Sequence, residues 1–175
     1  LFSVVRIPSL IALGIPSEEI TSKGLLLLNV QMAGMLIGGV FWGILGDKRG
    51  RLSVLFGSII LYSLANIANG FVTSVTWYTI IRFIAGVGLA GELGAGITLV
   101  TENMSKENRG YGTMIVAGVG LLGAVAAALI GDYYTWQTSY FIGGGMGLLL
   151  LLSSPRIIPM ELIPANLAAA ESARI

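Results

Sequence analysis

Five long apolar runs dominate this sequence, and their length limits what the chain can fold into. They cover residues 24–46, 52–72, 75–101, 110–131 and 135–153. The hydrocarbon core of a bilayer is about 30 Å thick, and a helix of about 20 residues crosses it. The runs therefore predict an all-α fold, a polytopic bundle of membrane helices.

The composition agrees with a membrane protein and excludes several function classes. Of the 175 residues, 55% are hydrophobic and 11% are charged, whereas roughly a quarter of a soluble domain is charged. The net charge is +1 and no basic stripe is present, so nucleic acid is not the expected partner. Cysteine and histidine are absent, which removes thiolate nucleophiles, zinc sites with Cys or His ligands, and imidazole bases. We expect no cofactor and no metal.

The two ends of the chain differ from its apolar middle. The first five residues are too few to span a membrane, and the chain begins without Met. We interpret residues 1–23 as the end of a clipped first helix plus an outer loop that contains Arg6 and Pro8. Residues 24–153 hold the five transmembrane helices, and 154–175 begin a cytoplasmic loop. On this interpretation the chain is a fragment with six spans.

The loop charges predict the orientation in the membrane, because Lys and Arg beside a span stay on the cytoplasmic side. Basic residues gather in alternate loops and in the tail: Lys48, Arg49, Arg51, Lys106, Arg109, Arg156 and Arg174. Aromatic residues gather at the opposite ends of the spans, as an interfacial belt requires: Trp77, Tyr78, Tyr133, Tyr134 and Trp136. We expect a multi-pass protein of the cell membrane.

Glycine is concentrated inside the spans, where small residues let helices approach closely. Three pairs have the four-residue spacing that lines one helix face: Gly34 and Gly38, Gly39 and Gly43, and Gly143 and Gly147. Five more glycines lie in the run 75–101, namely Gly86, Gly88, Gly91, Gly94 and Gly96. Close packing is one interpretation of these glycines, and hinges are the other.

A motif joins the first two runs, Gly43-Ile-Leu-Gly-Asp47-Lys-Arg-Gly50-Arg51. It resembles the cytoplasmic loop between the second and third helices of the major facilitator superfamily. The match departs from that pattern at Leu52, where the family has a second basic residue. Gly50 can adopt the backbone angles that a tight reversal demands, and Asp47 can cap a helix or pair with a cation.

A second stretch, Arg82-Phe-Ile-Ala-Gly86-Val-Gly88-Leu-Ala-Gly91-Glu92, resembles the fourth helix of the same superfamily. Glu102 and Arg109-Gly110 after it resemble the next loop of sugar porters and metabolite:proton symporters. The resemblance implies the amino-terminal half of a twelve-helix carrier, built from inverted three-helix repeats, that works by alternating access. It also implies a cytoplasmic charge latch formed by Asp47, Arg51, Glu102 and Arg109.

Arg82 and Glu92 are the charged residues enclosed by an apolar run. Ten residues place them about 15 Å apart along a helix, so they cannot pair with each other and each needs its own partner. A low-dielectric site favours the neutral form of a carboxyl group, so Glu92 is the candidate for loading and releasing a proton. Arg82 is the candidate for holding an anionic substrate or for biasing that proton. The alternative is that both are structural ions satisfied by neighbouring helices.

Amide side chains also lie within the runs, among them Asn29, Gln31, Asn66 and Asn69. Asn29 and Gln31 point to different sides of their helix, so only one of them can face a substrate pathway. Asn66 and Asn69 share one face, and we interpret them as polar contacts between helices.

These features predict proton-coupled transport of an organic acid or a similar metabolite. The resemblance of Gly91-Glu92 to organic-acid and sialate symporters favours a carboxylate substrate. A sugar or polyol porter, supported by Glu102 and Arg109, and a non-transporting sensor on the same fold remain alternatives. Ser153 stands where the sugar-porter sequence Pro-Glu-Ser-Pro-Arg has Glu, which weakens the sugar assignment. An intramembrane enzyme is disfavoured, because the chain has neither histidine nor a pair of mid-membrane aspartates.

The expected partners are the bilayer, a small solute, H⁺ and the carboxy-terminal half of the same carrier. We expect the fragment alone not to transport, because the substrate site would lie between the two halves.

Overall fold

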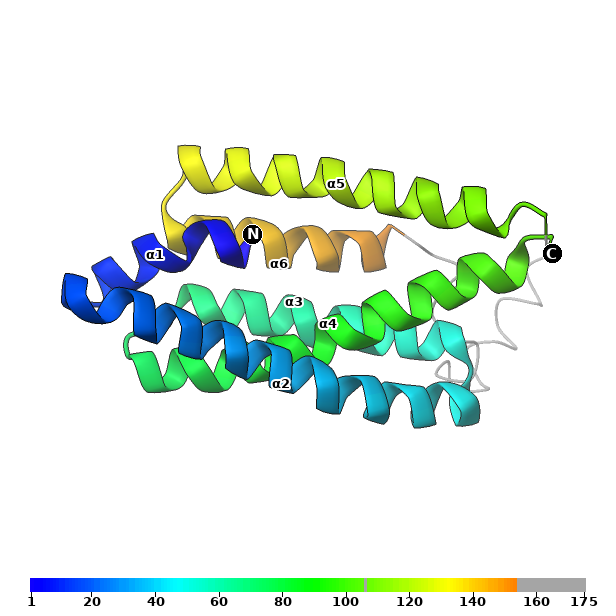
Figure 1. Cartoon of the computed structure of the whole chain (residues 1–175), viewed down its shortest axis with the longest axis horizontal. Coiled ribbons are helices and arrows are strands. Elements are labelled where there is room, and N and C mark those ends of the chain that lie inside the picture. The colour runs from blue at the N-terminus through cyan, green and yellow to red at the C-terminus, as the bar shows by residue number, and fades with distance from the viewer. Residues whose placement is uncertain (106, 154–175) are drawn as a thin grey trace, which may run out of the picture.

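The computed structural model describes residues 1–105 and 107–153, and helices account for most of them (Figure 1). The predicted all-α fold is confirmed. The predicted cytoplasmic segment 154–175, with Arg156 and Arg174, lies outside the described residues, as does Lys106. The helices are α1 Phe2–Ala12, α2 Ser17–Arg49, α3 Arg51–Gly70, α4 Val75–Asn103, α5 Arg109–Tyr133 and α6 Trp136–Leu152.

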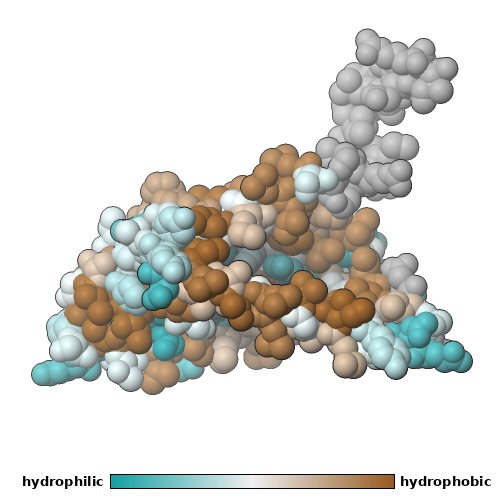
Figure 2. All heavy atoms as spheres, turned by 90° about the horizontal axis from the view of Figure 1, so that it is seen from above, coloured by the Kyte–Doolittle hydropathy of each residue, from teal (hydrophilic) through white to brown (hydrophobic). Residues whose placement is uncertain are grey.

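Four of these helices are long and apolar enough to cross a membrane: α2, α3, α5 and residues Val75–Glu102 of α4. Large apolar side chains lie exposed on their outer faces, such as Leu36 at 76% and Leu121 at 70%. Figure 2 shows apolar residues across the middle of the visible face and polar residues gathered at both ends. This distribution suits a bundle whose middle is surrounded by hydrocarbon.

The connections alternate between the two ends of the bundle (Figure 1). We call the end with the α2–α3 turn the inner end and the end with the α3–α4 connection the outer end, following the predicted orientation. At the inner end, Gly50 alone separates α2 from α3, and its φ of 85° lies in the left-handed region that glycine adopts without strain. At the outer end, Ser74 Oγ accepts a hydrogen bond from the Trp77 amide and caps the start of α4.

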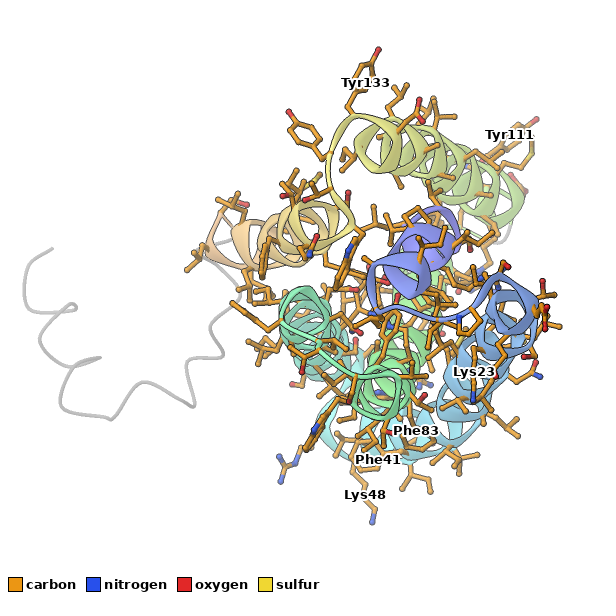
Figure 3. The ribbon with its side chains drawn as sticks, turned by 90° about the vertical axis from the view of Figure 1, so that its left-hand side faces the viewer. Lys23, Phe41, Lys48, Phe83, Tyr111 and Tyr133 are labelled. Atoms are coloured by element: carbon orange, nitrogen blue, oxygen red, sulfur yellow. The ribbon has the colours of Figure 1, made fainter. Side chains whose placement is uncertain are left out.

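The central helix of the bundle is α4, which packs between α2 and α3 (Figure 3). Glycines make the close approach possible. A Cβ atom added at Gly38 would lie 2.6 Å from the Val87 carbonyl oxygen of α4, and one at Gly34 would meet the Phe83 carbonyl. Gly86 faces the backbone of Gln31 in the same way. These three glycines therefore serve close packing.

The other predicted glycine pairs differ in their surroundings. A Cβ atom at Gly39 or Gly43 would meet nothing within 4 Å. A Cβ atom at Gly143 would lie 2.7 Å from the Leu1 side chain, and one at Gly147 would meet Ser63 Oγ of α3. Of the two glycine pairs in α2, only Gly34 and Gly38 make close contacts between helices in the described structure.

The expected outer loop is wrong in part, because Arg6 and Pro8 lie inside α1 and the helix continues to Ala12. Proline removes one backbone donor, which a helix in a packed membrane bundle can tolerate. Similarly, α2 begins at Ser17 and not near residue 24. Glu18 and Glu19 occupy its first turn, where acidic side chains favour helix formation. The length of the apolar run did not reveal these polar helical turns.

The least covered helix is α5. None of the residues in its most apolar stretch is buried, and Figure 3 shows it at the edge of the bundle with Tyr111 and Tyr133 pointing away. A full-length apolar helix with so little packing requires lipid or further protein around it.

Candidate functional site

The most buried charge in the described structure is Arg82, in the outer half of α4. Its side chain has an exposed fraction of 0%. Nη2 donates a hydrogen bond of 3.0 Å to Oδ1 of Asn66 on α3. Asn66 is itself 2% exposed, so this bond lies wholly inside the bundle. The predicted polar contact between helices is therefore present for Asn66, whereas Asn69 donates to the Ala65 carbonyl of its own helix.

Two aromatic rings also contact the Arg82 guanidinium. Its Cζ atom lies 4.9 Å from the ring centroid of Phe2 on α1 and 5.0 Å from that of Tyr140 on α6. Both distances are within the range of cation–π attraction. Arg82 is thus held by side chains from three other helices: α1, α3 and α6.

No carboxylate pairs with Arg82 among residues 1–105 and 107–153, and its Nε and Nη1 atoms are buried without a hydrogen-bond partner there. A guanidinium has five N–H donors, and the bond to Asn66 uses one of them. A buried cation with unused donors is unfavourable by itself, and an anion that accepts hydrogen bonds from those donors offsets that cost. The unused donors therefore match the acceptor oxygens of a carboxylate, and in this conformation the guanidinium is fully enclosed by protein.

A chain of buried hydroxyl groups lies beside this arginine. Ser9 donates to the Arg6 carbonyl at 2.7 Å, and its oxygen lies 2.9 Å from the Tyr78 hydroxyl, which is 2.7 Å from the Tyr140 hydroxyl. Because the Ser9 proton is directed to the carbonyl, Tyr78 donates to Ser9 and Tyr140 donates to Tyr78. Tyr78 is 0% exposed, so its predicted place in an interfacial belt is wrong. It belongs to the buried core near the outer end of the bundle, where its hydroxyl forms hydrogen bonds.

Glu92 lies ten residues further toward the inner end of α4 and is partly buried. It makes no hydrogen bond or ion pair with any described residue. The two amides of α2 differ as expected for residues two apart. Asn29 is exposed, whereas Gln31 is partly buried and its Oε1 atom has no partner among the described residues.

The inner end brings together three of the four latch residues. Arg51 Nη2 lies 3.3 Å from Asp47 Oδ1, and Arg51 Nε lies 3.7 Å from Glu102 Oε1. The pairs link the α2–α3 turn to the end of α4. Arg109 does not join them, because its Nε donates to the Met104 carbonyl at 3.4 Å. Gly43 lies within α2, and Gly50 forms the turn.

A cleft of about 230 Å³ opens beside this cluster, between α2, α3 and α4. Gly39, Gly43 and Gly94 line it, with Arg51 at its inner rim. Trp42 forms its wall and donates its indole N–H to the Val87 carbonyl of α4 at 2.8 Å. The cleft explains why a Cβ atom at Gly39, Gly43 or Gly94 would meet nothing within 4 Å.

Comparison with protein families shows which family the chain belongs to. Residues 7–166 match the family model described as Major Facilitator Superfamily. The chain belongs to the Major Facilitator Superfamily. This is a family of transporters and not of enzymes, and its membership together with the apolar helices makes the chain a multi-pass membrane protein.

Curated relatives are transporters of several metabolites. The niacin transporter NiaP of Acinetobacter baylyi is 34% identical over 122 residues, which are 67% of this chain and 28% of the relative. The benzoate transport protein of the same species is 30% identical over 140 residues, 75% of this chain and 30% of the relative. The sialic acid transporter NanX of Escherichia coli is 30% identical over 135 residues, 75% of this chain and 32% of the relative. The chain thus spans about a third of the length of these superfamily members.

Sequence reasoning missed several residues around Arg82 in this superfamily member: Phe2, Ser9 and Tyr140. It also did not connect Asn66 with Arg82, although a signal existed. Both residues lie eight positions from Ser74, and two antiparallel helices joined by a tight connection bring such positions to the same level. No comparable signal linked Tyr140 to Arg82, because α5 lies between them in the sequence.

Proposed function

We propose that this chain is the amino-terminal half of a carrier that moves a small organic acid across the membrane by alternating access. The observation that carries the proposal is the buried Arg82 with unused donors. Niacin, benzoate and sialic acid, named for three relatives, each bear a carboxyl group, which agrees with a cationic site.

The charge of Arg82 favours an acid over a neutral solute. A carboxylate accepts charge-assisted hydrogen bonds from a guanidinium and neutralises it inside a low-dielectric site. A sugar or polyol can accept hydrogen bonds but leaves the positive charge in place. Among the solutes weighed, the organic acid therefore gains most from this arginine, and the sugar porter is the less favoured alternative.

Glu92 is the proposed site of proton coupling. Its carboxyl group has no partner among the described residues, so it can change protonation without breaking a structural ion pair. Loading of a proton there offsets the negative charge that the substrate brings into the membrane. Gln31, with a buried and unpartnered oxygen, is the α2 residue that we assign to the same pathway, in preference to the exposed Asn29.

The latch residues are proposed to hold one state of the cycle. The pairs of Arg51 with Asp47 and Glu102 connect α2, α3 and α4 at the inner end. They are partly exposed, so they can break and form again as the carrier changes conformation. Arg109 is assigned to the latch only in a state in which it leaves the Met104 carbonyl.

The test uses the complete carrier reconstituted in lipid vesicles. Niacin, benzoate, sialic acid and glucose are added in turn while uptake and internal pH are measured. We expect an acid to be taken up and to acidify the vesicles, and glucose to do neither. Arg82→Gln should abolish uptake of the acid, whereas the matched variant Arg49→Gln, at the inner turn, should retain it.

Proton coupling has its own variant. Glu92→Gln should still bind the acid but should lose the coupled acidification. If the wild type takes up the acid without proton entry, the carrier is a facilitator and the proposed proton coupling is wrong. Uptake of glucose alone would support the sugar porter.

A further inference from the structure

A second arginine, Arg6 of α1, lies on the outer side of Arg82 and is also poorly satisfied. It is partly buried, and its Nε atom has no hydrogen-bond partner among the described residues. Its Nη1 donates to the Gly24 carbonyl of α2 at 3.5 Å, which is at the long limit for a hydrogen bond. That carbonyl lies inside a helix and already accepts a backbone bond. Arg6 is therefore held loosely.

A glycine provides the space for this guanidinium. Gly24 is buried, and a Cβ atom added there would lie 3.3 Å from Arg6 Nε and 3.7 Å from Arg6 Cζ. An alanine methyl at this position would require the guanidinium to shift by a few tenths of an ångström, and a larger side chain would require more. The α1–α2 contact thus contains a slot that Gly24 leaves open and that Arg6 fills.

The nearby acids do not neutralise Arg6. Glu19 on α2 pairs with Lys23 at 3.9 Å, and the two side chains are 56% and 40% exposed. Glu18 is exposed and forms no ion pair with Arg6. Within the described part of the chain, the slot therefore carries a positive charge without an acidic partner.

The position of Arg6 relative to Arg82 follows from α1. Phe2 and Arg6 are four residues apart and are neighbours on one face of the helix. Arg6 thus starts about 6 Å further toward the outer end than Phe2, whose ring contacts the Arg82 guanidinium. The Ser9 hydroxyl joins the two regions, since it donates to the Arg6 carbonyl and accepts from Tyr78.

We propose that Arg6 is a second anion-binding residue, which receives the carboxylate of the substrate from the outer side before Arg82 binds it. The inference rests on the proposed function, because it takes the anion at Arg82 to be the substrate. Two cations in series raise the local concentration of an anion and give it an intermediate site. The loose bond of Arg6 to Gly24 leaves its donors available for this first contact.

The experiment measures initial uptake of benzoate or niacin, whichever the uptake panel selects, by the complete reconstituted carrier. The half-saturating concentration and the maximal rate are compared for wild type, Arg6→Gln and Arg6→Lys. Lys23→Gln removes an exposed positive charge on the neighbouring helix and is the matched control. Inhibition of that uptake by the neutral amide, benzamide or nicotinamide, gives the affinity for an uncharged analogue.

We expect Arg6→Gln to raise the half-saturating concentration of the acid about tenfold, with the maximal rate within about twofold. Arg6→Lys should restore most of the affinity, and Lys23→Gln should behave as wild type. Inhibition by the amide should not change in any of these variants, because it carries no charge for Arg6 to attract. A merely structural role would alter the acid and the amide alike.

Gly24→Ala is a second variant that keeps the charge and narrows the slot, so that the Arg6 guanidinium must shift. It should also raise the half-saturating concentration of the acid and spare the amide. Wild-type affinity for the acid in Arg6→Gln, or equal effects on acid and amide, would overturn the inference. If Arg82→Gln also retains wild-type uptake of the acid, the proposed function fails with it; if Arg82→Gln abolishes that uptake, only the role of Arg6 fails.

Discussion

The bond between Arg82 and Asn66 leaves a positive charge buried in the outer half of the bundle. Asn66 is the one side chain in the described structure that accepts a hydrogen bond from this guanidinium. An amide satisfies part of the arginine without cancelling its charge. The site therefore stays cationic, and on the proposed function its remaining donors bind the substrate anion, which a carboxylate in place of Asn66 would prevent.

Substitution of Asn66 tests this view. Asn66→Leu should lower the free energy of unfolding by about 1.5–3 kcal/mol, because it removes a buried hydrogen bond to a charged group. Asn66→Asp should keep the stability and should lower uptake of the acid, because its carboxylate occupies Arg82. Thermal unfolding of the carrier in detergent and vesicle uptake measure the two effects. Full uptake by Asn66→Asp would contradict an anion site at Arg82.

Individual residues also show where sequence reasoning stopped. The charge and depth of Arg82 required a partner, and the equal distances of Asn66 and Arg82 from Ser74 would have identified it. Tyr78 directly follows Trp77 at the outer end of its run, and this position predicts both side chains at the membrane interface. Trp77 is 61% exposed, as that prediction requires, whereas Tyr78 is buried. Only the packing of α1 and α6 around α4 shows that Tyr78 points inward to Ser9 and Tyr140.

At the scale of the helix, two adjacent glycines of α2, Gly38 and Gly39, differ in the space around them. A Cβ atom at Gly38 would lie 2.6 Å from the Val87 carbonyl oxygen and 2.7 Å from the Val87 Cα atom. Backbone atoms cannot rotate away as a side chain can, so a methyl group added at Gly38 would push α2 and α4 apart. The spacing of glycines in the sequence predicted close helix packing, but it could not tell which pair faces α4 and which faces the cleft.

Gly38→Ala should therefore destabilise the carrier by about 1–3 kcal/mol, the usual effect of overpacking. Gly39→Ala is the matched control, since a Cβ atom there meets nothing within 4 Å in the described structure. The measurement is the temperature at which the detergent-solubilised carrier loses its monodisperse elution. Equal losses for both variants would refute the tight contact between α2 and α4.

For the molecule as a whole, the inner ion pairs are expected to matter more for function than for stability. Arg51→Gln removes the pairs with both Asp47 and Glu102. Partly exposed pairs contribute about 1 kcal/mol or less, so thermal unfolding should hardly change while the uptake rate falls several-fold. Lys48→Gln is the control from the same turn. The double variant Arg51→Glu, Glu102→Arg restores an ion pair between α3 and α4 with the charges exchanged. It should recover part of the uptake rate if that pair holds the latch.

The weak packing of α5 leads to a prediction for the fragment. Its apolar stretch has no buried residue, and the relatives are about three times as long as the aligned part. Residues 1–175, reconstituted alone, should move none of niacin, benzoate or sialic acid. The complete carrier in parallel vesicles provides the positive control, and uptake by the fragment would show that one half contains a full pathway.

The indole of Trp42 gives the molecule an optical reporter of its own. It is 8% exposed, it lies against Gly91 and Gly57, and its N–H bonds to the Val87 carbonyl. Indole emission shifts with the polarity and hydrogen bonding around the ring. With Trp77 and Trp136 replaced by Phe, this chain would retain one tryptophan, at the crossing of α2 and α4. Entry of water or lipid into the neighbouring cleft would then change the colour of the emitted light.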